Sequence, residues 1–417
     1  MSNILIMYFY KKIFNYFIKL KILLCLFLFP LIPKSTKNSN KLVLFGAMNG
    51  NYYGDNSKYL YEWMLKYRTD LQPIWFTHNK NIFDDLGTKG YPVALINTFY
   101  GQKLLKSAKI GCYTHSLRDI GSSFLVIPKS IKLIALRHGK SVKKVRFARE
   151  RHKLSKIEAL ERKKENKHIM YAISTSNFIS DIQERCLLIG KGKHIVTGYP
   201  RNDMLFSPSK ENKILWKEFL GDIKPKKVIL YGPTWRHGRE ATKFFPFIDF
   251  EKKKLKNFLE TKNILLLLRP HKNDLFKYKK LSDFLNKLAN SSNNIKFAFH
   301  NIFPDVNSIL PFVDVLISDY SALYHDFLLL DRPLVFIAYD YEDFNKQNGF
   351  LYDYFDNLPG PAISNFQELC SHLNQLCQGG DPFVEKRRLL RDKIHFYKDN
   401  RSCRRIAQLI DNILLEQ

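Results

Sequence analysis

Three segments in the second half of the chain each end an apolar run with polar side chains that could bind a diphosphate. Guanidinium groups pair with phosphate oxygens, and the free backbone N–H groups at the start of a helix favour negative charge. Parallel strands present their carboxyl ends at one edge of a sheet, so we expect the three sets to converge there. The segments are "ILYGPTWR" with Thr234 and Arg236, "LLLLRPH" with Arg269 and His271, and "LISDYSALYHD" with Ser321 and Asp326.

Each of these residues, taken alone, also has a simpler explanation. Ser321 could cap the helix that follows it. Arg236 and Arg269 could be surface cations, and His271 could be a core or surface imidazole with its hydrogen bonds satisfied. Capping does not explain two arginines and a histidine at strand ends, and this favours a binding site.

A fourth segment, "LIALRHGKSVKK", lies in the first half and places His138 and Gly139 directly after a predicted strand, with Lys143 shortly beyond. An imidazole has an unperturbed pKa of about 6.5 and can take a proton near neutral pH. Glycine permits a tight turn or the close approach of a ligand. The pattern fits a base for a hydroxyl that attacks phosphorus, and a loop histidine beside a basic helix is the alternative. In the turn "TGYPRND", Arg201 could bind an anion or pair with Asp203.

Strands alternate with segments of helical composition along the chain, which predicts an α/β fold with mostly parallel sheets. We predict two Rossmann-like domains that face each other across a cleft, over residues 37–205 and 206–417, the second with a basic helical tail. The predicted strands begin with one near residues 41–46 and continue at 72–78, 91–97, 109–115, 130–139, 168–175, 194–200, 226–236, 263–271, 295–301, 313–321 and 332–340.

Composition limits the choice of partners and compartment. The chain has 417 residues and a formal net charge of +28, which attracts anions such as nucleic acid, anionic lipid or phosphorylated substrates. Its six cysteines show no paired spacing, which is typical of free thiols in a reducing compartment. No cluster of histidine and acidic residues indicates a bound metal, and we expect no cofactor.

Residues 1–36 differ from the rest of the chain. They combine aromatic and apolar side chains with lysines, and their uninterrupted apolar run over residues 22–33 is shorter than the roughly 20 residues of a spanning helix. We expect a helical segment that lies on an anionic membrane surface, with its lysines at the headgroups. A signal peptide and a buried amphipathic helix are the alternatives.

The same segments, in the same order, resemble the CDP-glycerol glycerophosphotransferase family of teichoic-acid and capsule polymer synthases, from about residue 138 to residue 354. "TGYPRND" matches the family pattern, "YGPTWR" is close to Tyr-Ala-Pro-Thr-Trp-Arg, and "DVLISDYSALYHDFLLLDRPLVFIAYDYEDF" is the most specific match. "HGKSVKK" keeps the first, second and last residues of His-Gly-Thr-Pro-Leu-Lys but has Lys140 and Ser141 in the middle. Ala322 stands where the family has a second serine.

The resemblance implies a GT-B fold, with a CDP-alditol donor in the C-terminal domain and the acceptor approaching from the N-terminal domain. It implies that His138 and His271 are catalytic, that Arg236 binds the donor, and that Ser321 and Asp326 contact its phosphate and glycerol portion. The other expected substrate-binding residues are Thr234, Arg269, Gly139, Lys143 and Arg201. A glycerol or ribitol phosphate would pass to a hydroxyl group of a lipid-linked or capsular polymer at the cytoplasmic face of the membrane, and CMP would be released.

Two other functions stay open at this point. A nucleotide-sugar glycosyltransferase of the same fold would need a similar diphosphate site, although the last third of the chain shows no Glu-x7-Glu motif. A basic protein that binds nucleic acid or an anionic polymer would explain the charge but not the histidines at strand ends. The sequence has no RNA-binding signature, so we expect no nucleic-acid partner.

Overall fold

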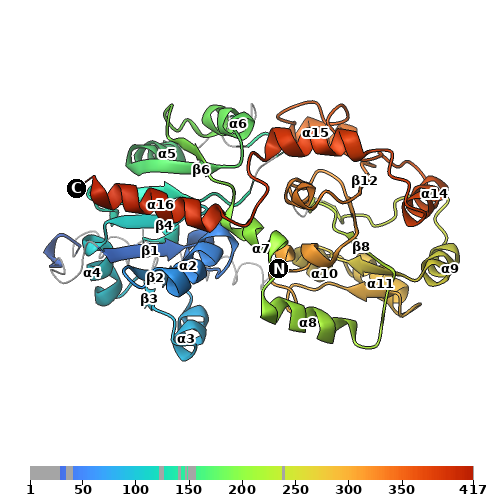
Figure 1. The fold of residues 1–417 in the computed structure, drawn as a ribbon, viewed down its shortest axis with the longest axis horizontal. Helices are drawn as coiled ribbons and strands as arrows, with labels where there is room; N and C mark the ends of the chain where they lie inside the picture. Colours follow the sequence, from blue (N-terminus) through green and yellow to red (C-terminus); the bar gives the residue numbers. More distant parts are fainter. Residues whose placement is uncertain are drawn as a thin grey trace, which may run out of the picture.

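The computed structural model describes residues 29–33, 41–121, 126–139, 142–145, 148, 156–236 and 240–416. Within them, two parallel β-sheets flanked by helices lie side by side (Figure 1). Each predicted strand segment contains a strand of these sheets, which confirms the α/β class. Cys112, Cys186, Cys370, Cys377 and Cys403 are free thiols, as expected.

The first sheet has seven parallel strands in the order β3-β2-β1-β4-β5-β6-β7. Its central strands are buried along their length, which explains why they are continuous apolar runs and do not alternate with polar residues. The strands are β1 (Leu42–Gly46), β2 (Gln72–Thr77), β3 (Val93–Leu95), β4 (Ile110–Tyr113), β5 (Lys132–Ala135), β6 (Ile169–Ser174) and β7 (His194–Val196).

Helices connect these strands, and several begin at a side chain that caps the first turn. Asn79, Thr98 and Ser176 each accept hydrogen bonds from backbone N–H groups at such a start. These caps fix where the chain leaves the loop at the carboxyl edge of the sheet. The helices are α2 (Asp55–Tyr67), α3 (Lys80–Thr88), α4 (Phe99–Ser107), α5 (Lys156–His168) and α6 (Asn177–Leu187).

The second sheet has five parallel strands in the order β10-β9-β8-β11-β12. The strands are β8 (Lys227–Tyr231), β9 (Ile264–Leu268), β10 (Ile295–Phe297), β11 (Val315–Ser318) and β12 (Leu334–Phe336). The helices of this half are α8 (Lys210–Leu220), α9 (Lys252–Lys262), α10 (Lys272–Lys277), α11 (Lys279–Ala289), α12 (Leu323–Phe327), α13 (Tyr341–Asn348), α14 (Phe366–Cys377) and α15 (Val384–Ile394).

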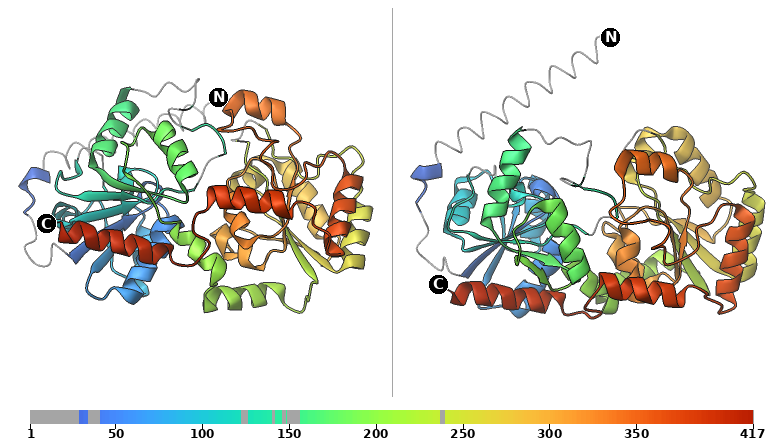
Figure 2. Two further views of the ribbon diagram at one scale, coloured as in Figure 1. Left: turned by 45° about the horizontal axis from the view of Figure 1, so that its top comes forward. Right: turned by 90° about the horizontal axis from the view of Figure 1, so that it is seen from above.

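The last helix, α16 (Ser402–Leu415), returns to the first half of the molecule. Ile406, Ile410 and Ile413 are buried in one cluster with Val43 of β1. Figures 1 and 2 show α16 alongside the first sheet, whereas α15 runs alongside the second. The helical tail was predicted to belong to residues 206–417; α15 lies with that half, whereas α16 packs on the other half. The limits of the two domains remain a prediction.

Residues 29–33 are the described part of the N-terminal segment, and the rest of residues 1–36 lies outside the described residues. Lys106 of α4 donates from Nζ to the carbonyl oxygens of Phe29 and Ile32, and Ile32 is buried. In the described part of the chain, no helix is both long enough and apolar enough to cross a membrane. The expected membrane-associating helix therefore remains a prediction.

Candidate functional site

His138 lies on an exposed turn that follows β5 at the carboxyl edge of the first sheet. The backbone φ angle is 57° at Arg137 and 127° at Gly139, so the chain reverses sharply around the histidine. The centroid of the His138 ring is 5.2 Å from that of His115, which follows the neighbouring strand β4. The turn thus exposes the His138 imidazole at this edge, beside the His115 ring.

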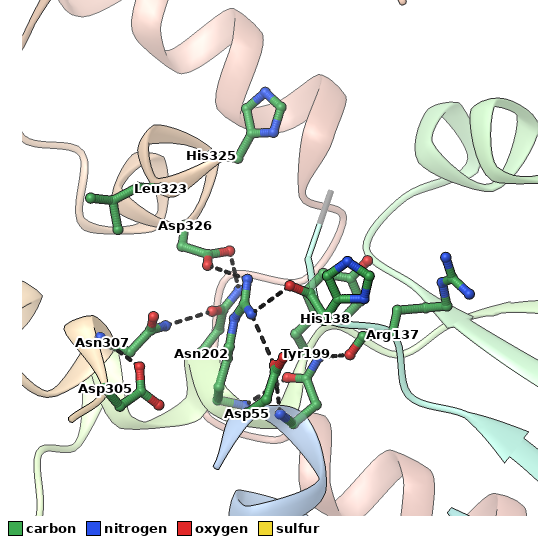
Figure 3. Close-up of polar contacts among 12 residues, drawn as sticks. Asp55, Arg137, His138, Tyr199, Asn202, Asp305, Asn307, Leu323, His325 and Asp326 are labelled. Atoms are coloured by element: carbon green, nitrogen blue, oxygen red, sulfur yellow. Dashed lines mark hydrogen bonds and ion pairs between the residues drawn. The ribbon is translucent and has the colours of Figure 1, made fainter. Parts of the chain in front are cut away.

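Arg201 connects this turn to the second half of the molecule, and Figure 3 labels three of its partners, Asp55, His138 and Asp326. Its Nη1 atom donates to the carbonyl oxygen of His138 at 3.0 Å and to Oδ1 of Asp55 at 2.9 Å, and Nη2 donates to Oδ2 of Asp326 at 2.7 Å. Burial alone would lower the pKa of the guanidinium, but the Asp326 and Asp55 carboxylates raise it above its ordinary value. Asp203 instead accepts from the backbone N–H groups that begin α16.

Asp326 and Ser321 lie at the start of α12. Asp326 is only 2% exposed, and its second oxygen accepts from Nδ2 of Asn202 at 3.2 Å. The hydroxyl oxygen of Ser321 accepts from the backbone N–H group of Leu323 at 3.2 Å, so it supports the first turn of the helix. Both Asp326 oxygens thus accept hydrogen bonds from residues of the other half, Arg201 and Asn202. The half-buried Ser321 hydroxyl group can still donate a hydrogen bond of its own.

A cavity of about 220 Å³ lies next to this cluster, between the two halves. Burial raises the pKa of the Asp55 carboxyl above its ordinary value, and Arg201 partly offsets that effect. The same cause raises the pKa of Tyr52 to about 12, so its phenol is neutral near pH 7. The cavity is lined by Tyr52, Asp55, Arg201, Asp305, Val306, Asn307, Ala322, Leu323 and Asp326.

Arg236 is buried at the carboxyl edge of the second sheet, where two carboxylates hold its guanidinium. Nε and Nη2 donate to the two oxygens of Asp340, each at 2.8 Å, and Nη1 donates to Oδ2 of Asp319 at 2.7 Å. Burial would lower the pKa of this group, and Asp319 and Asp340 raise it above the ordinary value. The guanidinium also lies 5.2 Å from the ring centroid of Tyr320. Arg236 thus ties together the loops that follow β8, β11 and β12.

Arg269 is engaged with the loop that follows β10. It is 7% exposed and donates to the carbonyl oxygens of Ala298 at 2.8 Å and Phe303 at 2.9 Å. Burial lowers its pKa to about 10. Its Nη2 atom also lies 3.2 Å from Nδ1 of His300. In this arrangement Arg269 shapes the loop that carries His300.

His271 and Thr234 lie on neighbouring loops of the same edge. The His271 ring stacks on the indole of Trp235, with centroids 4.7 Å apart, and its Nδ1 atom accepts from the backbone N–H group of Asn273 at 3.3 Å. These two contacts fix the plane of the His271 ring. The buried hydroxyl group of Thr234 has no hydrogen-bond partner among the described residues.

Lys143 belongs to a segment of the first half that pairs with the second half. It forms an isolated antiparallel bridge with Phe350, and the N–H group of Leu351 donates to the carbonyl oxygen of Val142 at 2.9 Å. Its Nζ atom lies 5.5 Å from the ring centroid of Phe344. The Arg236 guanidinium lies 5.3 Å from the same ring. Lys143 thus places a cation of the first half near the same aromatic ring as Arg236, in the second half.

The structure brings most of the predicted residues together in three groups. His138, Gly139, Arg201 and Asp326 meet at the junction, Thr234 contacts Arg236, and Arg269 and His271 both approach His300. Ser321 lies at the start of α12, and Lys143 lies on the segment that pairs with Phe350. Sequence reasoning missed Asp340, although it directly ends the predicted strand "RPLVFIAYD". It also missed Asp55 and Asn56. These two polar residues stand together at the start of the helix that follows the first strand, which could have drawn attention to them. Within the described residues, no group of histidine, cysteine and acidic side chains could hold a metal ion.

The fold defines the chain as a two-sheet α/β protein with parallel strands. Comparison with known proteins then identifies its family. The model of the CDP-glycerol:poly(glycerophosphate) glycerophosphotransferase family matches residues 29–412, so the chain belongs to this family. The resemblance noted from the motifs is confirmed, as is the enzyme class, CDP-glycerol glycerophosphotransferase.

Two relatives differ in length. The chain is similar to a teichoic acid glycerol-phosphate transferase of Staphylococcus aureus, with 26% identity over 92% of this chain and 95% of the relative. It is also similar to a teichoic acid poly(glycerol phosphate) polymerase of Bacillus subtilis, with 27% identity over 89% of this chain. The chain spans 48% of that polymerase, about half its length.

A solved structure of the wall teichoic acid polymerase TagF matches 91% of this chain and 90% of the solved chain, with a TM-score of 0.71 and 24% identity. At this identity the likeness shows the fold alone. It confirms the expected GT-B-like arrangement of two parallel α/β sheets.

Proposed function

We propose that the chain transfers a glycerol phosphate or related alditol phosphate from CDP-glycerol to a hydroxyl group of a lipid-linked or capsular polymer. Membership of the glycerophosphotransferase family is the observation that carries this proposal. In the reaction the acceptor oxygen bonds to the phosphorus that bears glycerol, the phosphoanhydride bond to CMP breaks, and the hydroxyl proton leaves. The products are a phosphodiester, CMP and a proton.

His138 is the proposed general base. It is exposed at the carboxyl edge of the first sheet, on the half from which the acceptor approaches. A positioned imidazole takes the hydroxyl proton as the new bond forms, which typically contributes 10²- to 10⁴-fold to a rate. The adjacent cations of the first half, such as Lys143, would attract the anionic polymer.

His271 is the proposed second catalytic histidine, on the donor half. Its ring is fixed by Trp235 and by the N–H group of Asn273, so it can donate a hydrogen bond to the transferring phosphoryl group or to the leaving CMP. The Thr234 and Ser321 hydroxyl groups provide further donors for the diphosphate. Arg236 and Arg269 support the loops that carry these groups.

The same proposal includes the kind of acceptor and the place of the enzyme in the cell. A polymer built on a membrane carrier would be met by a peripheral enzyme at the cytoplasmic face, held by residues 1–36 on anionic lipid. The cationic body of the protein suits a phosphate-rich polymer.

The test supplies CDP-glycerol, CDP-ribitol or a UDP-sugar, with a membrane extract as the acceptor source, and analyses products by mass spectrometry. We expect one alditol phosphate added per CMP released, and only with a CDP-alditol. The His138→Ala variant should lower kcat by about 10²- to 10⁴-fold while the protein still binds CDP-glycerol. Sugar transfer, or a His138→Ala variant with normal kcat, would refute the substrate class or the base, respectively.

A further inference from the structure

The turn that carries His138 is held by hydrogen bonds to its backbone from two directions. Asn56 of α2 donates from Nδ2 to the carbonyl oxygens of Leu136 at 2.9 Å and Arg137 at 2.8 Å. Arg201 then donates to the next carbonyl oxygen, that of His138, at 3.0 Å. The carbonyl groups of three successive residues, Leu136, Arg137 and His138, are thus fixed. They hold the backbone of the turn and so the point from which the His138 side chain projects.

The two side chains that hold this turn are themselves connected. The backbone N–H group of Arg201 donates to Oδ1 of Asn56 at 3.2 Å, and its Nη1 atom donates to Asp55 at 2.9 Å. Gly139 completes the fit, because a Cβ atom on it would lie 2.9 Å from Nη2 of Arg201. With φ at 127° as well, this position suits glycine alone.

Arg201 also reaches the second half of the molecule. Nη2 donates to Oδ2 of Asp326 at 2.7 Å, and Asn202 donates to the other oxygen at 3.2 Å (Figure 3). Asn307 of the second half donates to Oδ1 of Asn202 at 3.2 Å. The side chains of Arg201 and Asp326 are 12% and 3% exposed. A connected polar network therefore runs from the His138 turn to the start of α12.

This network occupies the atoms that a substrate would need. Arg201 uses both Nη atoms on protein acceptors, and Asp326 uses both carboxylate oxygens on protein donors. The carboxyl groups of Asp55 and Asp326 both accept hydrogen bonds from the Arg201 guanidinium and offset its positive charge, which weakens its attraction for a phosphate. Among the described residues, the buried Nε atom of Arg201 has no hydrogen-bond partner. A substrate that took over the Nη contacts or the Asp326 oxygens would have to open the network.

We infer that Arg201 is a positioning residue that fixes the His138–Gly139 turn and, through Asp326, sets its place relative to the donor half. This inference rests on the proposed function, because it takes His138 as the base. Misplacing a reacting group by about 1 Å can cost about 10²-fold in rate. Arg201 and Asp326 therefore act on the chemical step and not on substrate binding.

The test compares Arg201→Met and Arg201→Lys with a matched control, Arg68→Met. Arg68 is also a mostly buried arginine that bridges two carboxylates, those of Asp70 and Asp411, but it lies at the other end of α2. We expect Arg201→Met to lower kcat by about 10- to 100-fold with a soluble acceptor analogue. The dissociation constant of CDP-glycerol, measured by calorimetry, and the acceptor KM should change less than about threefold. Arg201→Lys should recover part of kcat, and Arg68→Met should leave all three unchanged.

A second variant covers the case in which Arg201→Met does not fold. Asp326→Asn keeps the shape and one acceptor oxygen, and it should lower kcat in the same direction but less. Combined with Arg201→Lys, its effect should be smaller than the product of the two single effects, because both act on one network. Independent effects would overturn the inference, as would a normal kcat in Arg201→Lys and Asp326→Asn, or a loss confined to substrate affinity.

The inference and the proposed function can fail separately. The NMR signal of the His138 ring, assigned by its loss in His138→Ala, reports the position of the turn without any reaction. A shifted signal in Arg201→Lys together with full activity of His138→Ala would retain the positioning of the turn and reject the base. An unshifted signal with an inactive His138→Ala variant would retain the base and reject the positioning role.

Discussion

Arg236 belongs to a motif of the family and is also buried and paired with two carboxylates. Its guanidinium is 6% exposed and forms an ion pair with each of Asp319 and Asp340. A buried charge that loses its partner is strongly destabilising, typically by 3 to 5 kcal/mol. The motif "YGPTWR" therefore has a structural role in this chain in addition to any contact with a donor.

We expect Arg236→Ala to lower the free energy of unfolding by about 3 to 5 kcal/mol, because it leaves two buried carboxylates without a cation. Urea denaturation would measure this. Arg388→Ala is the control, because Arg388 pairs with Asp331 at the surface, where an ion pair contributes little to stability. A fully stable Arg236→Ala variant that binds CDP-glycerol weakly would instead assign Arg236 to the donor alone.

His194 of β7 gives the molecule a predictable response to acid. Both of its ring nitrogens are buried and have no hydrogen-bond partner among the described residues. Burial, with a smaller contribution from Arg137, lowers its pKa to about 4. The folded state then binds fewer protons than the unfolded state between pH 6.5 and pH 4. Stability is fully present above the unfolded pKa of about 6.5 and is lost as pH falls toward the folded pKa.

We expect His194→Gln to reduce the loss of stability of the protein between pH 7 and pH 5. The ring is partly exposed, so the difference should be about 1 kcal/mol, less than the full shift would give. Urea denaturation of the variant and the wild type at the two pH values measures it. Equal losses in the two proteins would show that His194 is not protonated on unfolding in this range.

At the scale of elements, the apolar runs predicted all the strands of the described structure, but they did not predict which side chains at the strand ends pair with one another. Strands such as β9, "ILLLL", are buried along their whole length, so local composition identifies them. The sequence offered Asp203, two residues away, as an ion-pair partner for Arg201. The structure instead pairs Arg201 with Asp326, which lies 125 residues away and could not be found from local sequence. The polar ends of strands located the site edges, but the sequence could not show that Arg236 and Arg269 bind their own loops.

Close contacts between elements make some glycines sensitive to substitution. Gly46 ends β1, and a Cβ atom there would lie 1.9 Å from the carbonyl oxygen of Asp119, in the loop after β4. We expect Gly46→Ala to destabilise the protein by about 1 to 3 kcal/mol, because backbone must move. Gly87, inside α3, has no atom within 4 Å of such a Cβ, and Gly87→Ala should stabilise the protein by about 0.5 to 1 kcal/mol. Thermal unfolding of the two variants checks both signs, and a stabilised Gly46→Ala variant would contradict the contact.

At the scale of the whole molecule, the two halves are joined by several separate links. The bridge between Lys143 and Phe350 and the ion pair between Arg201 and Asp326 both cross the junction. The chain also crosses back to the first half after α15, and α16 packs on the first sheet. The stability of the first half therefore depends on the last residues of the sequence.

Hydrogen exchange can locate this dependence. Ile410 of α16 is fully buried in the cluster that contains Val43 of β1, and removing most of its side chain should cost about 2 to 5 kcal/mol. We expect Ile410→Ala to speed exchange in β1 more than in β9 of the second sheet, because local opening follows the cluster that lost its packing. Leu415→Ala is the control, since Leu415 is 82% exposed and should leave both strands unchanged. Faster exchange in β9 than in β1 would show that α16 stabilises the second half, contrary to its packing.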